Sequence, residues 1–336
     1  MSLLSVNPST ARTIERYPEM SPAEVDAALD AAREDWLVWK ETSFEHRASL
    51  MREAAALLGA RKDELARLMA EEMGKPVRQG RAEVEKCAWA CAYYADHAAA
   101  HLAPDPVATG AGKSYVAFQP LGPVLAVMPW NFPLWQVYRF AAPALMAGNV
   151  GVLKHASNVS GCALAIEAMF RDAGFPEHAF RTLLLPSGRV KEIVEDRRIR
   201  AVTLTGSTPA GQAVASQAGA VLKKTVMELG GSDPYLILED ADLDQAARTC
   251  VDARLVNSGQ SCIAAKRFIV VADVLEPFTE RFVALMRARK VGDPLREDTE
   301  VGPLARADLR DDLHRQFTAS VQAGARLLLG GEVPEG

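Results

Sequence analysis

The sequence predicts an α/β protein built on an open sheet of parallel strands, followed by a second α/β unit and carrying a projecting hairpin. Three observations lead to this prediction. Apolar residues make up 49% of the chain and charged residues 24%, which allows sizeable buried cores. The length of 336 residues exceeds what one ordinary domain needs. From residue 121 onward, short β-rich runs alternate with helical patterns, as in parallel sheets with crossover helices.

The composition argues against several classes of protein. The 38 Lys and Arg residues and 43 Asp and Glu residues leave a net charge of −5, spread along the chain, which disfavours a nucleic-acid or polybasic membrane partner. No apolar stretch reaches membrane-spanning length, and the first ten residues lack the pattern of a signal peptide. The five cysteines are few and unevenly spaced, which is typical of reduced thiols. We therefore expect a cytoplasmic protein.

The first hundred residues are predicted to be helical. Ser21 and Glu24 form a capping-box pattern in front of a helix that ends near Trp39. A second helix is expected over residues 44–73, where a Gly and a Pro follow, and a third over residues 78–101.

Residues 102–120 interrupt the helical pattern. They place prolines and glycines around a turn, and residues 114–119 alternate as a strand does. We expect a hairpin arm that projects from the body of the protein. Exposed strand edges are usually covered, so a neighbouring subunit is expected to lie against this arm.

The alternation after residue 121 predicts the order of the sheet elements. Five strands are expected at residues 123–128, 150–153, 180–185, 201–205 and 223–227. Helices are expected between them at residues 134–146, 158–173, 190–196 and 209–219. The second unit is expected to hold helices at 243–257, 275–289 and 307–323, a strand at 267–271 and a further strand candidate at 326–329.

Polar, charged or Gly-rich segments follow four of the predicted strands. These segments are residues 129–133, 154–157, 206–211 and 228–231. Ligands of open α/β sheets bind beyond the carboxyl ends of the strands, so the sequence predicts a ligand site at this edge.

Two of these segments suit an anionic ligand. Residues 206–211 open a helix whose free N–H groups favour a pyrophosphate, although a plain strand-to-helix turn explains them equally well. Lys154 at a strand end can hydrogen-bond ribose hydroxyls or a phosphate, whereas a lone lysine is more often simply solvated.

Cys262 is the candidate nucleophile. It ends the small polar loop Asn-Ser-Gly-Gln-Ser-Cys at 257–262, where a thiol is a better nucleophile than on an apolar helix face. The other cysteines fall on predicted helices and are interpreted as core residues: Cys87, Cys91, Cys162 and Cys250. No histidine has a partner at metal-ligand spacing, so no metal is assigned.

Three short motifs resemble the signatures of NAD(P)-dependent aldehyde dehydrogenases. They are Pro-Trp-Asn-Phe-Pro at 129–133, Glu-Leu-Gly-Gly at 228–231 and Gly-Gln-Ser-Cys at 259–262, in the order of that family. Residues 206–208 and Lys154 also match family cofactor positions, and the resemblance runs from about Val6 to the last residue. It implies a Rossmann-like cofactor domain (1–101 and 121–229), an oligomerisation arm (102–120) and the first part of a catalytic domain (230–336).

Within this family the chain is similar to the succinate-semialdehyde dehydrogenase branch. The segments that carry this similarity are Leu-Lys-His-Ala at 153–156, Glu-Leu-Gly-Gly-Ser-Asp-Pro at 228–234 and Ala-Ala-Lys-Arg-Phe at 264–268. Arg139, eight residues after Asn131, matches an arginine that binds the distal carboxylate of the substrate in this branch. A second arginine of some members is Val256 here, with Arg254 two positions away. The resemblance implies oxidation of succinate semialdehyde to succinate, or of another aldehyde to its acid.

The resemblance also implies a covalent mechanism. Cys262 attacks the aldehyde as a thiolate, and the Asn131 side-chain amide and the Cys262 backbone N–H stabilise the oxyanion of the thiohemiacetal. Hydride then passes to the nicotinamide, and Glu228 activates the water that hydrolyses the thioester. The residues implied to contact the cofactor are Met128, Pro129, Trp130, Lys154, Ser157, Gly206, Ser207, Gly211 and Leu229.

Ser157 bears on the choice of cofactor. Family members that prefer NAD often carry a Glu at this position, which accepts a hydrogen bond from the adenosine 2′-hydroxyl and repels a 2′-phosphate. A serine beside Lys154 removes this repulsion. NADP is therefore expected to be accepted, with NAD as the alternative.

The chain ends before the family's Glu-x-x-x-Gly-Pro segment, which holds the nicotinamide ribose. We therefore expect a fragment that stops at Gly336, from a longer parent that forms a homodimer or homotetramer. Two alternatives to a working dehydrogenase stay open. One is a nucleotide-binding fragment that keeps residues 121–231 without turnover. The other is a cysteine hydrolase that uses Cys262 without a cofactor, for which no motif places a histidine as base.

Overall fold

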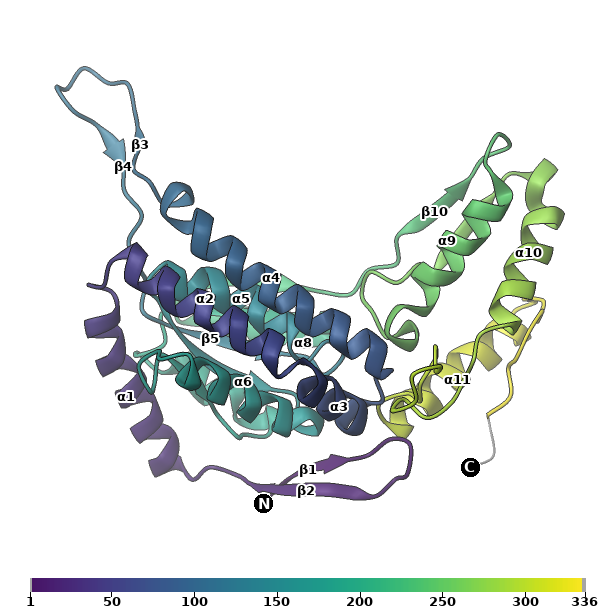
Figure 1. Ribbon diagram of the computed structural model, residues 1–336, viewed down its shortest axis with the longest axis horizontal. Coiled ribbons are helices and arrows are strands. Elements are labelled where there is room, and N and C mark those ends of the chain that lie inside the picture. Colours follow the sequence, from purple (N-terminus) through teal and green to yellow (C-terminus); the bar gives the residue numbers. More distant parts are fainter. Residues whose placement is uncertain (1, 334–336) are drawn as a thin grey trace.

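The central element of the structure is a five-stranded sheet (Figure 1). The computed structural model describes residues 2–333, so the expected chain end at Gly336 lies outside the described residues. The strands are all parallel and lie in the order β7-β6-β5-β8-β9. Their bounds are β5 Pro123–Met128, β6 Val150–His155, β7 Phe180–Thr182, β8 Ala201–Thr205 and β9 Lys224–Glu228. The predicted α/β fold class and all five strands are confirmed, although β6 is longer and β7 shorter than expected.

The strand order reverses between β5 and β8, which sets where the helices lie. Right-handed crossovers place α5 and α6 on one face of the sheet and α7 and α8 on the other. Helices α2, α3 and α4 pack outside α5 and α6, and α1 packs directly on β5, β6 and β7. The bounds are α1 Pro22–Trp39, α2 Phe44–Ala60, α3 Lys62–Met73, α4 Val77–His101, α5 Trp135–Met146, α6 Ser160–Asp172, α7 Val190–Glu195 and α8 Thr208–Ala220. The short 3-10 turn η1 (Ser157–Val159) precedes α6, and η2 (Ser187–Arg189) precedes α7.

The capping box predicted for the first helix is present in the structure. Ser21 Oγ accepts a hydrogen bond from the Glu24 backbone N–H at 3.3 Å, and the Glu24 carboxylate accepts one from the Ser21 N–H at 2.7 Å. These two bonds satisfy N–H groups that the helix itself leaves unpaired.

The prediction that the first hundred residues are purely helical is wrong. The chain begins with an antiparallel hairpin, β1 (Ser2–Val6) and β2 (Thr13–Pro18). Most of β2 is exposed and rich in charge, so no hydrophobic pattern marks it as a strand. A distant contact helps to hold the hairpin, because Ser5 Oγ donates to the buried carboxylate of Glu72 at 2.8 Å.

The single helix expected over residues 44–73 is also wrong, because the structure has α2 and α3 there. The backbone of Arg61 leaves the helical region, with φ −101° and ψ 18°. Its guanidinium forms ion pairs with Glu64 and with Asp172 on the neighbouring α6. The break therefore depends on tertiary contacts that the local sequence does not reveal.

Residues 102–120 leave the body as the predicted hairpin. The strands β3 (Asp105–Pro106) and β4 (Tyr115–Val116) form a short antiparallel pair beyond the end of α4, and Figure 1 shows the hairpin projecting from the body. About half of each of the side chains of Tyr115, Val116 and Phe118 is exposed.

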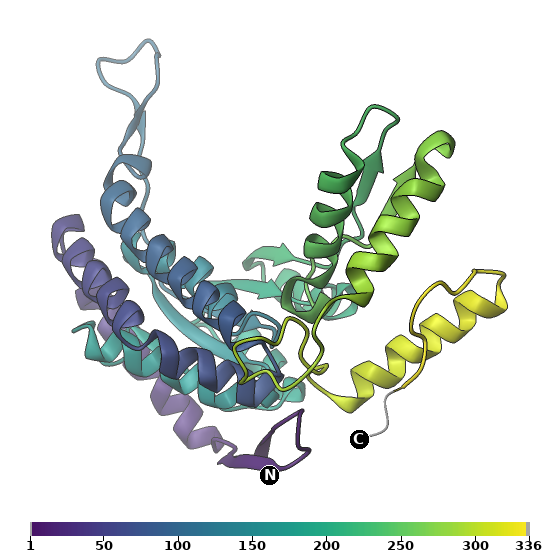
Figure 2. The ribbon, with the colours of Figure 1, turned by 45° about the vertical axis from the view of Figure 1, so that its right-hand side comes forward.

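The second unit has a core of its own, and Figure 2 shows its helices and strands grouped apart from the five-stranded sheet. The parallel strands β10 (Pro234–Ile237) and β11 (Arg267–Val270) pack with α9 (Leu243–Leu255) and α10 (Leu275–Arg287) around Cys250. The turns η3 (Val256–Gly259) and η4 (Ala272–Val274) and the helix α11 (Ala307–Gln322) complete the unit. Strand β10 was not predicted.

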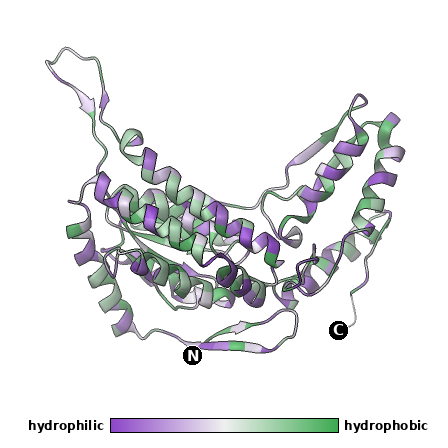
Figure 3. Ribbon diagram, in the orientation of Figure 1, coloured by the Kyte–Doolittle hydropathy of each residue, from purple (hydrophilic) through white to green (hydrophobic). Residues whose placement is uncertain are grey.

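The strand candidate at residues 326–329 is wrong. This segment has no regular structure, and its leucines line a shallow apolar groove with side chains of α10 and α11. In Figure 3, green and purple residues alternate along α1, α9, α10 and α11, as expected for amphipathic helices with one solvated face. Within residues 2–333, no helix combines the length and hydropathy that a bilayer crossing requires.

Candidate active site

The loop before Cys262 has an unusual backbone conformation. Asn257, Ser258 and Gly259 all have positive φ, at 52°, 55° and 80°. Left-handed conformations cost L-residues about 1 kcal/mol or more each, so the surrounding structure must hold this turn. A side chain at Gly259 is disfavoured by its φ of 80°, and a Cβ built there comes within 2.6 Å of Arg254 Nη2, so the guanidinium would have to move.

Arg254 fixes the loop from the last turn of α9. Its guanidinium donates to the carbonyl oxygens of Gly259, at 2.6 Å, and Ala265, at 2.8 Å. Burial lowers the pKa of this guanidinium. Arg254 is therefore committed to backbone carbonyls on both sides of Cys262, whereas Val256 lines the neighbouring cavity.

Cys262 differs from the other cysteines in its accessibility. Its side chain is partly exposed, whereas Cys87, Cys91, Cys162 and Cys250 are buried. Burial raises the pKa of each of these four thiols, to about 12 for Cys91. The thiolate is the reactive form, so Cys262 is the thiol best placed to react with a ligand from solvent.

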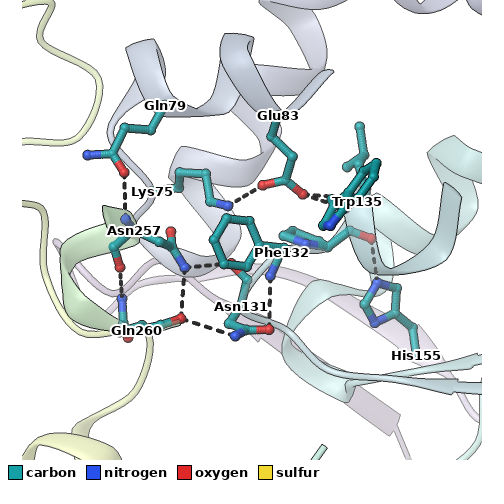
Figure 4. A network of polar contacts seen from close by, with 11 residues as sticks. Lys75, Gln79, Glu83, Asn131, Phe132, Trp135, His155, Asn257 and Gln260 are labelled. Carbon is teal, nitrogen blue, oxygen red and sulfur yellow. Dashed lines mark hydrogen bonds and ion pairs between the residues drawn. The ribbon is translucent and has the colours of Figure 1, made fainter. Parts of the chain in front are cut away.

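Asn131 lies against the Cys262 loop, as Figure 4 shows. Its side-chain Nδ2 donates to the carbonyl of Gln260 at 3.1 Å, and its own carbonyl accepts from Asn257 Nδ2 at 2.6 Å. The segment after β5 and the segment after α9 are thus joined by two hydrogen bonds. A side-chain amide has two N–H donors, so the second one can serve a bound oxygen.

A cavity of about 580 Å³ opens beside Cys262. Its walls include Phe132, Trp135, Arg139 and Val256 together with Cys262. Further basic side chains that line it are Arg78, Lys86 and Arg289. The acidic residues Glu83, Asp252 and Glu300 line it too, and Arg289 forms ion pairs with Asp252 and Glu300. The cavity therefore combines one accessible thiol with apolar walls and with side chains of both charges, among them Arg139.

Arg139 and Glu228 face each other from α5 and the end of β9. Arg139 Nη1 lies 3.8 Å from the Glu228 carboxylate, and Arg139 Nη2 donates to Thr205 Oγ1 at 3.2 Å. The Glu228 side chain is 57% exposed and does not line the cavity. The structure thus brings Asn131, Cys262 and Arg139 together and leaves Glu228 at the margin, in contact with water.

The predicted cofactor residues gather where the strand order reverses. Met128 ends β5 and Pro129 and Trp130 follow it, while Gly206 and Ser207 follow the neighbouring strand β8. Ser207 is the N-cap of α8 and accepts from the Ala210 N–H at 3.4 Å. The crevice at this reversal is where open α/β sheets bind nucleotides.

Gly211 and Leu229 pack closely in the same region. A Cβ on Gly211 comes within 2.6 Å of Leu229 Cδ2, so a side chain at residue 211 would require the Leu229 side chain to move. Ser157 begins the 3-10 turn that follows β6, and Lys154 and His155 are the last two residues of that strand. These positions suit a nucleotide laid across the carboxyl ends of the strands.

Lys154 has an unusual environment for a lysine. It is 6% exposed at the end of β6, and no carboxylate among residues 2–333 forms an ion pair with it. Burial lowers the pKa of its ammonium to about 8. A buried ammonium without a counter-ion fits a site for an anionic or hydroxyl-rich ligand.

His155 serves the structure of the site edge. It is buried, donates from Nε2 to the carbonyl of Pro133 at 2.9 Å and accepts at Nδ1 from the Ala156 N–H. Burial lowers the pKa of His155 to about 4. The imidazole is therefore neutral at pH 7, with both nitrogens already used.

Sequence reasoning did not find three polar residues that lie in the first turns of α4 or just before it. Gln79 Oε1 accepts from the Asn257 N–H at 2.7 Å, and Glu83 Oε1 accepts from the Leu134 and Trp135 N–H groups, each at 2.9 Å. Lys75 forms a fully buried ion pair with Glu83. Burial lowers the pKa of Lys75, because desolvation disfavours its charged form. A motif scan misses these residues because their partners lie far away in sequence.

Comparisons with known proteins agree with this geometry. Residues 2–336 match the model of the aldehyde dehydrogenase family. A succinate-semialdehyde dehydrogenase (NADP(+)) of Mycobacterium avium is 51% identical over 340 residues, covering 100% of this chain and 72% of that protein. A succinate-semialdehyde dehydrogenase (NADP(+)) 1 of Mycobacterium tuberculosis is 49% identical over 335 residues, covering 99% of this chain and 73% of that protein.

A solved structure gives the same result for the fold. The succinic semialdehyde dehydrogenase from Streptococcus pyogenes, in complex with NADP+ as the cofactor, superposes with a TM-score of 0.97 at 34% identity. The match covers 99% of this chain and 73% of that one. Both the sequence match and the fold lead to one conclusion: the chain belongs to the aldehyde dehydrogenase family.

Proposed function

We propose that this protein oxidises succinate semialdehyde to succinate with NADP as the cofactor. The observation that carries the proposal is the cavity that places the accessible thiol of Cys262 and the guanidinium of Arg139 around one space. An aldehyde with a distal carboxylate presents one reactive group to each. The substrates and cofactor in the names of the relatives support this choice.

The thiol chemistry follows from the loop geometry. The Cys262 thiolate adds to the aldehyde carbon, and the carbonyl oxygen becomes an alkoxide that the Asn131 amide and the Cys262 backbone N–H stabilise. Removing one such donor typically costs about 3–4 kcal/mol in transition-state stabilisation. NADP held by the residues at the strand ends would supply the hydride acceptor for that carbon, and loss of the hydride would leave a thioester on Cys262.

Hydrolysis of the thioester needs a base that water can reach. Glu228 is the candidate, because its carboxylate is largely exposed at the end of β9. It takes a proton from water, the resulting hydroxide adds to the thioester carbon, and the Cys262 thiolate leaves as the acid forms. Burial and hydrogen bonding leave His155 without a proton-accepting nitrogen, which disfavours the cysteine-hydrolase alternative at this edge.

The cofactor pocket is proposed to use the residues at the strand ends. The residues that fit the nucleotide are Met128, Pro129, Trp130, Lys154, Ser157, Gly206, Ser207, Gly211 and Leu229. Lys154 supplies a buried positive charge, and Ser157 places no carboxylate against a 2′-phosphate. Ser157→Glu is expected to weaken NADP binding at least tenfold and to spare NAD binding, measured by titration calorimetry.

The division of the chain follows from this assignment. We propose a cofactor domain of residues 1–101 and 121–229, an arm of residues 102–120 and a catalytic portion of residues 230–336. The exposed Tyr115, Val116 and Phe118 on the arm suit contact with a second copy of the chain, as in a homodimer or homotetramer. Light scattering after gel filtration tests this, and a monomer at micromolar concentration contradicts it. Reduced thiols suit the cytoplasm, and cell fractionation tests that placement.

The first experiment measures NADPH formation at 340 nm with succinate semialdehyde, for the wild type and for Cys262→Ala. Turnover that depends on Cys262 supports the dehydrogenase. NADP binding without turnover favours the nucleotide-binding alternative. A Glu228→Gln variant separates the two half-reactions, since it is expected to release one equivalent of NADPH rapidly and then turn over slowly.

A further inference from the structure

The start of α4 presents two polar side chains toward the candidate active site. Gln79 and Glu83 lie four residues apart, so they face the same side of the helix, one turn from each other (Figure 4). Each is hydrogen-bonded to backbone N–H groups of a different loop. One of these loops carries the nucleophile and the other carries Asn131.

Gln79 is fixed at both ends of its amide. Its Oε1 accepts from the Asn257 N–H at 2.7 Å, and its Nε2 donates to the carbonyl of Glu300 at 3.1 Å. Asn257 is the first residue of the left-handed turn that leads to Cys262. The Gln79 side chain therefore anchors the strained end of the nucleophile loop to a rigid helix.

Glu83 anchors the other loop. The N-cap residue of α5, Leu134, makes no side-chain capping hydrogen bond, and the Leu134 and Trp135 N–H groups donate to Glu83 Oε1 instead, each at 2.9 Å. The second carboxylate oxygen pairs with Lys75, whose Nζ lies 3.9 Å from the centre of the Phe132 ring. One oxygen of this buried carboxylate thus holds the segment after Asn131 directly, and the other holds it through Lys75.

We propose that Gln79 and Glu83 are positioning residues that set the distance between the Asn131 amide and the Cys262 loop. This inference rests on the dehydrogenase reaction proposed above. One helical turn of α4 acts as a fixed spacer of about 5.4 Å between the two anchors. Asn131 and Asn257 then complete a closed circuit by bonding across the loops.

If the buried ion pair of Lys75 and Glu83 served only stability, its carboxylate would not need to contact the loops of the site. Well-packed apolar residues often replace a buried ion pair without loss of stability. Here the paired carboxylate also caps the helix that follows Asn131, and Gln79 reaches the second loop from the same face. A displacement of a catalytic group by about 1 Å can lower the reaction rate by about 100-fold. A fixed distance between the Asn131 loop and the Cys262 loop is therefore important for turnover.

A double-mutant cycle tests the proposal in the full chain. Glu83→Ala is expected to lower kcat about 100-fold while the Kd for NADP rises less than tenfold, because Lys154, Ser157 and Gly206 are proposed to contact the nucleotide from strand ends that Glu83 does not touch. In an Asn131→Ala background the same substitution is expected to lower kcat less than threefold. Glu83→Gln keeps a carbonyl acceptor and is expected to restore most of the rate. An equal loss in both backgrounds overturns the proposal.

A matched variant controls for general damage. Val84 is fully buried on the same helix and touches neither loop through a hydrogen bond, so Val84→Ala reports destabilisation alone. It is expected to lower the melting temperature without a comparable loss of kcat. A loss of kcat similar to that of Glu83→Ala counts against positioning.

A second measurement needs no turnover, so it separates this inference from the proposed function. Hydrogen exchange in Glu83→Ala is expected to accelerate over residues 131–136 and also over residues 256–263, and alkylation of Cys262 by iodoacetamide is expected to change in rate. Exchange confined to residues 131–136, with unchanged alkylation, contradicts a coupled spacer. Absence of wild-type turnover overturns the dehydrogenase and still leaves this coupling measurable.

Discussion

Arg254 Nη2 donates to the carbonyl oxygen of Gly259 at 2.6 Å, and the same nitrogen occupies the space that a Cβ on residue 259 requires. The arginine therefore holds the turn before Cys262, and a Cβ at residue 259 would require its guanidinium to move. Because Gly259 also has φ 80°, two independent constraints act on one residue.

Gly259→Ala is expected to disrupt this turn. The left-handed backbone alone costs alanine about 1 kcal/mol or more, and the contact with Arg254 adds to this. We expect turnover to fall at least tenfold, measured as NADPH formation. Gly219→Ala in α8 is the matched control, since a Cβ there meets no atom within 4 Å. That variant is expected to keep full activity, and equal losses in the two variants contradict the argument.

Thiol titration is expected to distinguish Cys262 from the other cysteines. The native protein is expected to react rapidly with one equivalent of Ellman's reagent, because four of the five thiols are buried and have raised pKa values. Five equivalents are expected after denaturation. In Cys262→Ala the rapid phase is expected to vanish, and its persistence identifies another accessible thiol.

Arg139→Gln is expected to weaken recognition of a distal carboxylate. Charge-assisted hydrogen bonds contribute about 1.5–3 kcal/mol, which corresponds to a loss of about 10- to 100-fold in kcat/KM for succinate semialdehyde. Butanal has the same chain length without the carboxylate, and its kcat/KM is expected to change less than threefold. Similar losses for both aldehydes indicate that Arg139 acts on Glu228 or on the fold instead.

Lys154→Met is expected to weaken NADP binding and at the same time to stabilise the fold. Folding lowers the pKa of the ammonium from 10.5 to about 8, so the charged form is disfavoured in the folded state below pH 8. This cost fades as the pH rises from 8 to 10.5. At pH 7 the variant is expected to gain about 1–3 kcal/mol in free energy of unfolding and to bind NADP at least tenfold more weakly. A lower free energy of unfolding together with unchanged NADP affinity would contradict this role of Lys154.

His155 is expected to make stability depend on pH below neutrality. Its pKa is about 4 in the folded state and 6.5 unfolded, so the unfolded chain binds the extra proton first as the pH falls. The folded state is expected to lose about 2 kcal/mol through this group between pH 7 and pH 5. Urea unfolding at the two pH values measures the change. His155→Gln is expected to remove that part of the pH dependence, and an unchanged pH dependence rejects it.

Local patterns were enough to predict the sheet and the residues that carry chemistry. Strand β5 matches its predicted bounds because an unbroken apolar run ends at Met128, and β8 matches because its β-rich run Ala-Val-Thr-Leu-Thr ends directly before Gly206. Cys262 stood out because a thiol in a polar, Gly-containing loop has no packing role to explain it. Each of these signals lies within a few consecutive residues.

Predictions failed where the deciding contact came from far away. The break at Arg61 and the hairpin of β1 and β2 depend on Asp172 and Glu72, which belong to other elements. The strand candidate at 326–329 had the apolar composition of a strand, but its leucines pack irregularly in a groove against α10 and α11.

The sequence by itself determined the family, the positions of the five sheet strands along the chain and the identity of the candidate nucleophile, because each rests on residue types at short, fixed spacing. Only the tertiary structure decided that Arg254 binds backbone carbonyls and that Gln79 and Glu83 hold the two loops of the site. Gln79 and Asn257 are 178 residues apart, and Glu83 and Leu134 are 51 apart. Such hydrogen bonds exist only once packing has brought the helix and the loops together, and no local pattern encodes that distance.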